Sequence, residues 1–300
     1  MRPYSLAFLT VLAWNTAAFS QNAPPAGKDI GATVEAITGL KAARQGAQVK
    51  ITIPQKDLNV RLDGWSITPP MGLSSWAAFA PMADGAVVMG DFVLQDKEIA
   101  PVERTLLDKG LTFTGLHNHF MGEEPRVMFM HIHGQGSVES LARGVRALMD
   151  KIREIRGSTP GASDPPAVAS SLPVANLEAT LGQRGEMSSG VLRFVFGRPD
   201  VKLESHGIEV TSFMGFNTWA AFQGTADRAA VAGDFTMLEN EVAPVIAALT
   251  RNNIEVVALH NHMVHEQPRI FFLHYWGVGP AQKLASGLRD ALSQTGHPEP

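Results

Sequence analysis

Apolar and polar residues alternate along several short segments of the chain, whereas other segments repeat apolar residues every three or four positions. Strict alternation favours strands, and the longer spacing favours helices. The sequence therefore predicts strands over "QVKITIP" (48–54), "LNVRLDG" (58–64) and "GAVVMGDFVL" (85–94), and a short helix over "TVEAITG" (33–39). The segment "TPPMGLSSWAAFAP" (68–81) is expected to be a loop.

The next segments predict a helix followed by a pair of strands. "DKEIAPVERTLLDKG" (96–110) has acidic residues at its start, Pro101 in its first turn and Gly110 at its end, as helices commonly do. "LTFTGLHNH" (111–119) and "RVMFMHIHG" (126–134) are predicted strands. Because the turn between them is short, the two strands should be antiparallel.

A last helix is expected to begin after Ser137, a residue type that often caps helices. The apolar stripe of this helix consists of Val138, Leu141, Val145, Leu148 and Ile152. A similar helix near the end of the chain has an apolar stripe that consists of Leu284, Leu288 and Leu292. The similarity of these helices belongs to a wider repetition. Adding 143 to a residue number between Glu35 and Gly136 returns a matching residue at about a third of the positions, without a gap.

This repetition predicts a tandem duplication. His117-Asn118-His119 returns as His260-Asn261-His262, for example. The predicted segments are a signal peptide (1–20), a flexible N-terminus (21–29), repeat 1 (30–155), a linker rich in Pro, Ser and Gly (156–172) and repeat 2 (173–297).

The order of elements predicts an α+β fold. Strands and helices are mixed rather than alternating, and the short turns require antiparallel pairs. We expect two tandem pseudo-symmetric repeats, each a mainly antiparallel sheet with helices packed on one face. Each repeat alone would have a small core, so the two are expected to pack about a pseudo-twofold axis.

Composition limits the possible partners. Hydrophobic residues make up 45% and charged residues 18% of the chain, as in a globular protein. The net charge is −4 and no basic block is present, which argues against binding of nucleic acid. The chain has no cysteine, so a metal site would have to use His, Asp, Glu and carbonyl oxygens. Zn, Mn, Fe, Ni and Cu all accept such ligands.

The N-terminal residues are typical of an export signal. Arg2 is followed by a short apolar stretch, and Ala18-Phe19-Ser20 places small residues at the positions that signal peptidase requires. We expect cleavage there, no stable membrane insertion afterwards, and a periplasmic or secreted protein. An unidentified small molecule or envelope component would then be its ligand.

The hairpin over 115–134 concentrates histidines on one face. His117 and His119 are two residues apart and share a face of their strand, while His131 lies on the partner strand. Glu123 lies at the turn. The resulting pattern, His-x-His-x3-Glu-x7-His, is a candidate metal site in each repeat, formed by His117, His119, Glu123 and His131, and by His260, His262, Glu266 and His274.

Two other interpretations of the histidines remain open, a hydrogen-bonded polar cluster and a catalytic histidine that needs no metal. Asp91 and Asp234 lie in apolar strands and could accept hydrogen bonds from the histidines, or could be structural carboxylates. Arg126 and Arg269 could hold an anionic substrate, although a salt bridge to Glu123 or Asp91 is an alternative.

Trp76 and Trp219 could stack on a sugar ring or could belong to the core. No catalytic nucleophile motif or phosphate-binding glycine loop is evident. The pattern "LHNH…E.PR…FLH.WG.G", present twice in an exported protein, resembles the bacterial LppY/LpqO family, which is defined by a domain of unknown function. That family takes its name from lipoproteins, whereas this chain has no cysteine to carry a lipid.

Three functions are therefore consistent with the sequence. The first is a metal-dependent enzyme that polarises its substrate or activates water, with Glu123 or Glu124 as a proton shuttle. The second is a module that binds metal or an envelope ligand without turnover. The third is a structural role for the histidines between the repeats. Whether the protein is an enzyme is left open by the sequence.

Overall fold

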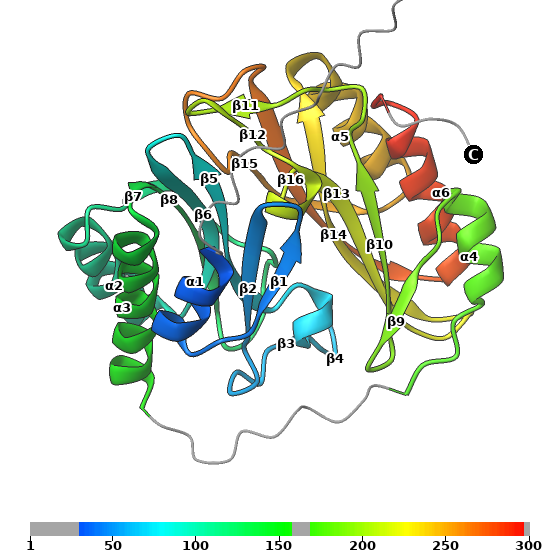
Figure 1. Ribbon diagram of the computed structural model, residues 1–300. Coiled ribbons are helices and arrows are strands. Elements are labelled where there is room, and N and C mark those ends of the chain that lie inside the picture. Colours follow the sequence, from blue (N-terminus) through cyan, green and yellow to red (C-terminus); the bar gives the residue numbers. More distant parts are fainter. Residues whose placement is uncertain (1–29, 158–168, 297–300) are drawn as a thin grey trace, which may run out of the picture.

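The structure, a computed structural model, describes residues 30–157 and 169–296. These residues form two similar halves, each with a six-stranded antiparallel sheet and three helices (Figure 1). The predicted α+β fold with tandem repeats is therefore confirmed.

The first half contains one sheet with the strand order β1-β2-β5-β6-β8-β7. Its elements are α1 (Ile30–Thr38), β1 (Ala42–Gln45), β2 (Gln48–Pro54), β3 (Arg61–Leu62), β4 (Trp65–Ser66), the 3-10 turn η1 (Pro69–Met71), β5 (Ser74–Met82), β6 (Gly85–Leu94), α2 (Asp96–Asp108), β7 (Thr112–His117), β8 (Met128–Gly136) and α3 (Val138–Arg156).

The second half repeats this topology with the order β9-β10-β13-β14-β16-β15. Its elements are α4 (Val174–Leu181), β9 (Glu186–Ser188), β10 (Val191–Gly197), β11 (Glu204–Ser205), β12 (Ile208–Glu209), η2 (Ser212–Met214), β13 (Asn217–Gly224), β14 (Ala229–Leu238), η3 (Glu239–Glu241), α5 (Val242–Arg251), β15 (Glu255–His260), β16 (Ile270–Gly279) and α6 (Ala281–Leu292).

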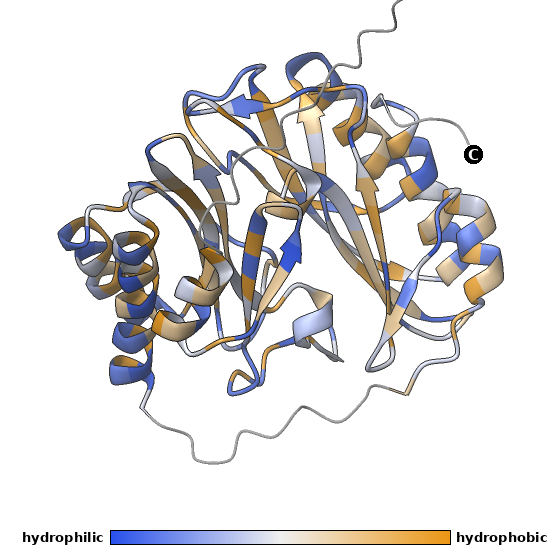
Figure 2. Ribbon diagram, viewed as in Figure 1, coloured by the Kyte–Doolittle hydropathy of each residue, from blue (hydrophilic) through white to orange (hydrophobic). Residues whose placement is uncertain are grey.

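The two sheets face each other in the middle of the molecule, and the helices cover their outer faces (Figure 1). The helices carry both hydrophobic and hydrophilic residues, as expected where one side packs on a sheet (Figure 2). On the outer face of the first sheet, Met130 and Ile132 are buried with Leu141 and Val145 of α3. Because neighbouring residues of a strand point to opposite faces, His131 lies on the inner face.

Each half sends a segment across to the other sheet. Residues 58–73 of the first half share a buried cluster with β13 and β14, and residues 203–216 of the second half share one with β5 and β6. The exchanged segments enclose the space between the sheets. Parts of the inner faces are therefore buried even where their side chains are polar, as at Asp91 and Asp234.

Most predicted elements are confirmed, and two are wrong. The expected loop over 68–81 instead contains η1 and most of β5, an inner strand between β2 and β6. The expected strand over 58–64 is reduced to β3, because this segment crosses to the other half instead of joining the sheet. Ser137 caps α3 as predicted, since its Oγ accepts a hydrogen bond from the amide of Ser140 at 3.1 Å.

The predicted signal peptide and flexible N-terminus lie outside the described residues. Of the predicted linker, Arg156 ends α3 and Leu172 is buried in the second core, while residues 158–168 also lie outside the described part. Within the described residues, no helix is long and apolar enough to cross a membrane.

Candidate metal centre

A row of polar and aromatic residues crosses the inner face of the first sheet. Trp76 of β5 pairs with Asp91 of β6, and Asp91 pairs with His131 of β8. Directly paired residues on neighbouring strands point to the same face. The antiparallel register therefore places these three side chains beside one another between the sheets.

The second half contains an equivalent row. Trp219 of β13 pairs with Asp234 of β14, which pairs with His274 of β16. Asp91 and Asp234 are about 4% and 2% exposed, whereas Trp76 in the first row is half-buried. The two rows face each other because the two sheets do.

The hairpins of the two halves meet at the pseudo-twofold axis. Thr114 Oγ1 donates a hydrogen bond to the carbonyl of His262, and Asn261 Nδ2 donates to the carbonyl of Thr114. A Cβ on Gly115 would lie 2.8 Å from the carbonyl oxygen of Asn261, so this close approach requires glycine. The two predicted metal clusters consequently lie in one place.

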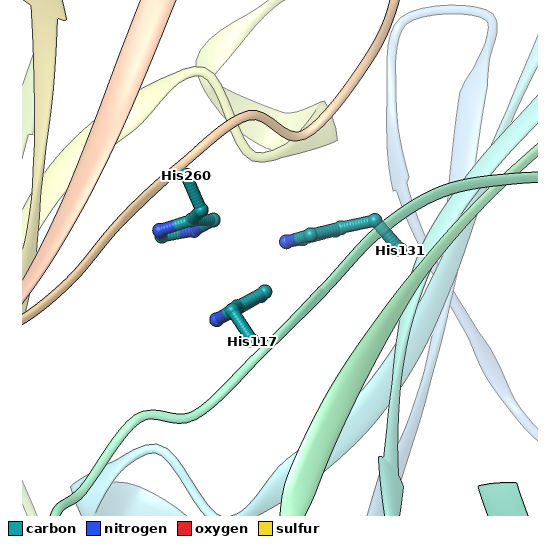
Figure 3. Close-up of side chains that lie close together, drawn as sticks. All are labelled: His117, His131 and His260. Carbon is teal, nitrogen blue, oxygen red and sulfur yellow. The ribbon is translucent and has the colours of Figure 1, made fainter.

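Six histidine rings, three from each half, form a single stacked cluster. His117 and His260 lie 3.8 Å apart between ring centroids. His119 and His274 also lie 3.8 Å apart, and the equivalent pair, His262 and His131, 4.1 Å apart. Figure 3 shows that the rings of His117, His131 and His260 gather in the space between the two hairpins.

Three groups within this cluster could hold a metal ion, since the ligand atoms of each lie within 4.8 Å of one another. The groups are His117, His131 and His260; His117, His119 and His274; and Asp234, His260 and His262. The first two groups combine residues of both halves. The third group lies within the second half, and none of the three groups is the His-x-His-x3-Glu-x7-His set that the sequence pattern predicts for one repeat.

Backbone carbonyls fix the orientation of two rings. His131 Nδ1 lies 3.3 Å from the carbonyl oxygen of Gly90, and His274 Nδ1 lies 3.0 Å from that of Gly233. A carbonyl oxygen can only accept, so each Nδ1 must carry the hydrogen. The Nε2 atoms then carry lone pairs, which is the arrangement found in histidine ligands of metals.

Burial keeps the histidines neutral. Burial is the main reason why the pKa values of these residues lie well below the usual range, and neighbouring histidines lower the values further. The residues are His117, His260, His262 and His274. Neutral imidazole is the form that ligates metal. Both ring nitrogens of His117 and His260 are buried and make no hydrogen bond with the rest of the described protein. Such unpaired buried atoms are costly unless a ligand uses them.

The two equivalent aspartates have different ionisation. Burial raises the pKa of Asp91, but His131 and His119 outweigh it and the net pKa is lowered. Asp91 Oδ2 lies 3.5 Å from His119 Nε2. Burial, reinforced by Asp91, raises the pKa of Asp234 well above the usual range, although a hydrogen bond from the amide of Leu273 opposes it. Two carboxylates so close cannot both ionise easily.

The predicted glutamate ligands do not join any of these metal-binding groups. Glu123 Oε1 accepts a hydrogen bond from the amide of Val127, and Glu266 Oε1 accepts one from the amide of Ile270. Both carboxylates thus close the hairpin turns that precede β8 and β16. In both halves the carboxylate lies four residues before the amide whose hydrogen bond it accepts, a local spacing that fits a turn as readily as a ligand.

The two predicted substrate arginines lie at the surface. Arg126 Nε is 3.9 Å from the carboxylate of Asp96, and Arg269 Nη1 is 3.4 Å from that of Glu266. Arg126 and Arg269 do not line the cavity described below. Arg269 thus lies beside the glutamate equivalent to Glu123, whereas Arg126 lies near Asp96 and not near either acid named as its alternative partner.

A cavity of about 300 Å³ adjoins the histidine cluster on the axis. Its walls contain the equivalent pairs Lys50 and Arg193, Trp76 and Trp219, Asp91 and Asp234, His119 and His262, and His131 and His274. All of these pairs except Lys50 and Arg193 are candidate site residues that the sequence predicts. Their shared offset of 143 was a signal that could have found them.

The model of a protein family described as Domain of Unknown Function (DUF1259) matches residues 32–151 and 175–294 of the chain. The chain belongs to this family. Both segments fall inside the predicted repeats, and the duplication is confirmed. Among curated proteins, none matches this chain.

Two solved structures are similar over most of their length. The trimeric bacterial microcompartment shell protein PduB and EtuB from Clostridium kluyveri are each 11% identical, with 85% of this chain and 91% of theirs covered. The TM-score is 0.20 for both, and at that value neither carries an argument about this chain.

Proposed function

We propose that this protein binds divalent metal ions at a centre shared by its two halves and uses them as a metal-dependent enzyme. The observation that carries the proposal is that two of the ligand groups have no residue in common: His117, His119 and His274 in one, and Asp234, His260 and His262 in the other. Two ions could therefore bind together. Three protein ligands per ion leave a position open for water or substrate, as in catalytic zinc sites.

The cavity gives a substrate access to this centre. Four histidines of the cluster also line the cavity: His119, His131, His262 and His274. A bound ion would polarise a substrate or activate water there. Asp91 is the carboxylate placed to accept a proton, because it lines the cavity whereas Glu123 and Glu124 do not. Imidazole and carboxylate ligands suit zinc, manganese, iron, nickel or copper.

Metal analysis tests the proposal. Untagged protein should contain close to two ions per chain, and His119→Gln and His262→Gln should each lose one. His131→Gln should keep both, since His131 belongs to neither group. Loss of a single ion in His131→Gln alone would instead place one ion between His117, His131 and His260. Absence of metal after reconstitution would overturn the proposal.

A module that sequesters metal without turnover is the second candidate. His131 belongs to neither of the two separate ligand groups, so the cluster holds one histidine more than two such ions need, which favours this function. The two candidates differ in whether a coordination position is exchangeable. Rapid exchange of a bound water, measured by relaxation of solvent protons with Mn²⁺ in the site, supports the enzyme, whereas a closed ion supports sequestration.

We also propose that the protein is exported, with residues 1–20 removed, and that it is related to the LppY/LpqO proteins. The apolar N-terminal stretch and the small residues at Ala18 and Ser20 support export. Sequencing the N-terminus of the mature protein tests it. A protein that begins at residue 21 supports export, and one that retains Met1 in the cytoplasm contradicts it.

A further inference from the structure

Lys50 and Arg193 occupy equivalent positions on the two sheets and line the cavity beside the histidines. Lys50 lies on β2 and Arg193 on β10, the second strand of each sheet. The Lys50 ammonium lies 4.0 Å above the ring of Trp76, and the Arg193 guanidinium 4.5 Å above the ring of Trp219. The two aromatic rings hold the cations at defined places in the walls.

Neither cation has a carboxylate within ion-pairing distance among the described residues. Lys50 Nζ donates one hydrogen bond, to the carbonyl of Phe213 at 3.3 Å. Glu186 faces Arg193 across strands β9 and β10 but is exposed and forms no ion pair with it. Both cations therefore retain donors that can reach into the cavity.

The two cations also repel each other. Burial lowers the pKa of Lys50 to about 8, and the charge of Arg193 contributes to this shift. Metal ions in the adjoining cluster would add further positive charge. The aspartates offset this only in part, because Asp91 already lies 3.5 Å from His119 Nε2 and 4.0 Å from His131 Nδ1, and Asp234 belongs to one of the ligand groups. An anion between the cations would relieve the repulsion.

We propose that Lys50 and Arg193 together bind an oxyanion group, a carboxylate or a phosphate, of a small substrate and orient that substrate toward the histidine cluster. The claim that the anion is part of a substrate rests on the proposed function. The claim that an anion binds rests on the cavity alone. A volume of about 300 Å³ suits a small organic anion. The cations cover one face of Trp76 and of Trp219, so these rings support the cations rather than a sugar.

Equilibrium dialysis of the full chain against radiolabelled inorganic phosphate and against succinate tests this inference. We expect the wild type to bind at least one of the two, and uncharged dimethyl succinate not to compete. Lys50→Gln and Arg193→Gln should each weaken binding by about tenfold or more, as expected for a lost charged hydrogen bond. Arg104→Gln, an exposed change of equal charge on α2, should leave binding unchanged.

The two anions identify the oxyanion chemistry, since a carboxylate site should prefer succinate and a phosphate site inorganic phosphate. Lys50→Arg keeps the charge and should recover binding if the Gln variant fails through charge rather than folding. Wild-type affinity in both Gln variants, or binding of neither anion by the wild type, overturns the inference. Metal content measured on the same samples separates the two proposals, because the Gln variants should keep their ions.

Discussion

The two halves have matching residues and contacts at the pseudo-twofold axis, but they differ two residues further along the strands. At the axis, His131 and its equivalent His274 are the same residue and make the same contact with a backbone carbonyl. Two residues further along each strand, His133 corresponds to Trp276. Both outer positions also contact the other half, but by unrelated interactions.

These outer contacts show how freely the packing between the halves can vary. Trp276 Nε1 donates a hydrogen bond to Asp63 Oδ2 at 2.9 Å. In the equivalent place, His133 and His206 stack with ring centroids 4.1 Å apart. Burial, with a contribution from His206, lowers the pKa of His133 to about 4. Either of these two interactions therefore packs the outer position. Metal binding at the axis would instead require histidine ring nitrogens that lie close together.

The largest expected difference between axis and periphery is in metal affinity. His117→Ala removes a ligand from two of the three groups, so one of the two ions should bind more than about 100-fold more weakly. His133→Ala changes a buried histidine outside every group and should keep both ions. Competition with a chromophoric chelator measures both variants. Equal losses in the two would show that the axis has no special role.

The next largest effect concerns the pH dependence of stability. An unfolded chain binds protons at its histidines near pH 6.5, whereas the folded chain does so only at lower pH because the pKa values of His117, His260, His262 and His274 are lowered. Lowering the pH therefore favours unfolding. These four histidines together should lower the unfolding free energy of the metal-free protein by about 2 to 3 kcal/mol between pH 7 and pH 6, whereas the raised pKa of Asp234 acts in the opposite direction. Urea denaturation at the two pH values measures this, and equal stabilities would contradict neutral burial.

A smaller difference should separate the two aspartates in the metal-free protein. Asn resembles a protonated carboxyl, so Asp234→Asn should cost less than about 1 kcal/mol because the pKa of Asp234 is raised. Asp91→Asn removes a charge that two histidines stabilise and should cost about 2 kcal/mol. Thermal unfolding at pH 7 compares them. Identical costs would show that the halves share the negative charge equally.

The smallest effect is expected at the periphery. Trp276→Phe keeps most of the packing but removes the hydrogen bond to Asp63, which should cost about 1 kcal/mol. Replacing His133 by Trp and His206 by Asp together should introduce a second Trp–Asp pair. That double variant should be more stable than either single change, as a double-mutant cycle would show. Additive effects would mean that the new pair does not form.

Much of the fold could be predicted because it is set by local patterns. Alternation predicted β2, the apolar segment over 85–94 was predicted as the strand β6, and the position of Ser137 predicted the start of α3. The predicted hairpin has His131 on the face opposite the apolar Met130 and Ile132. The loop predicted over 68–81 failed because β5 is buried on both faces, and so has no alternating pattern to detect.

The candidate site could be predicted only within one repeat. The convergence of His117 with His260 depends on how the halves pack, and no spacing within a repeat specifies that packing. Lys50 alternates with apolar residues, which is also the pattern of a strand facing water. Its polar face instead meets a partly enclosed cavity between the halves, and the sequence does not distinguish these two environments.

The central claim, that the two halves build one shared centre, is tested most directly by the metal content of His260→Gln/His274→Gln. This double variant breaks all three ligand groups, although His117, His119 and His131 remain. We predict that it binds no tightly held ion, whereas His133→Gln/His206→Gln, with the same number of changes, keeps two ions. Both variants should match the wild type in circular dichroism. One ion bound at wild-type affinity by His260→Gln/His274→Gln would mean that the first repeat has a site of its own and would contradict the shared centre.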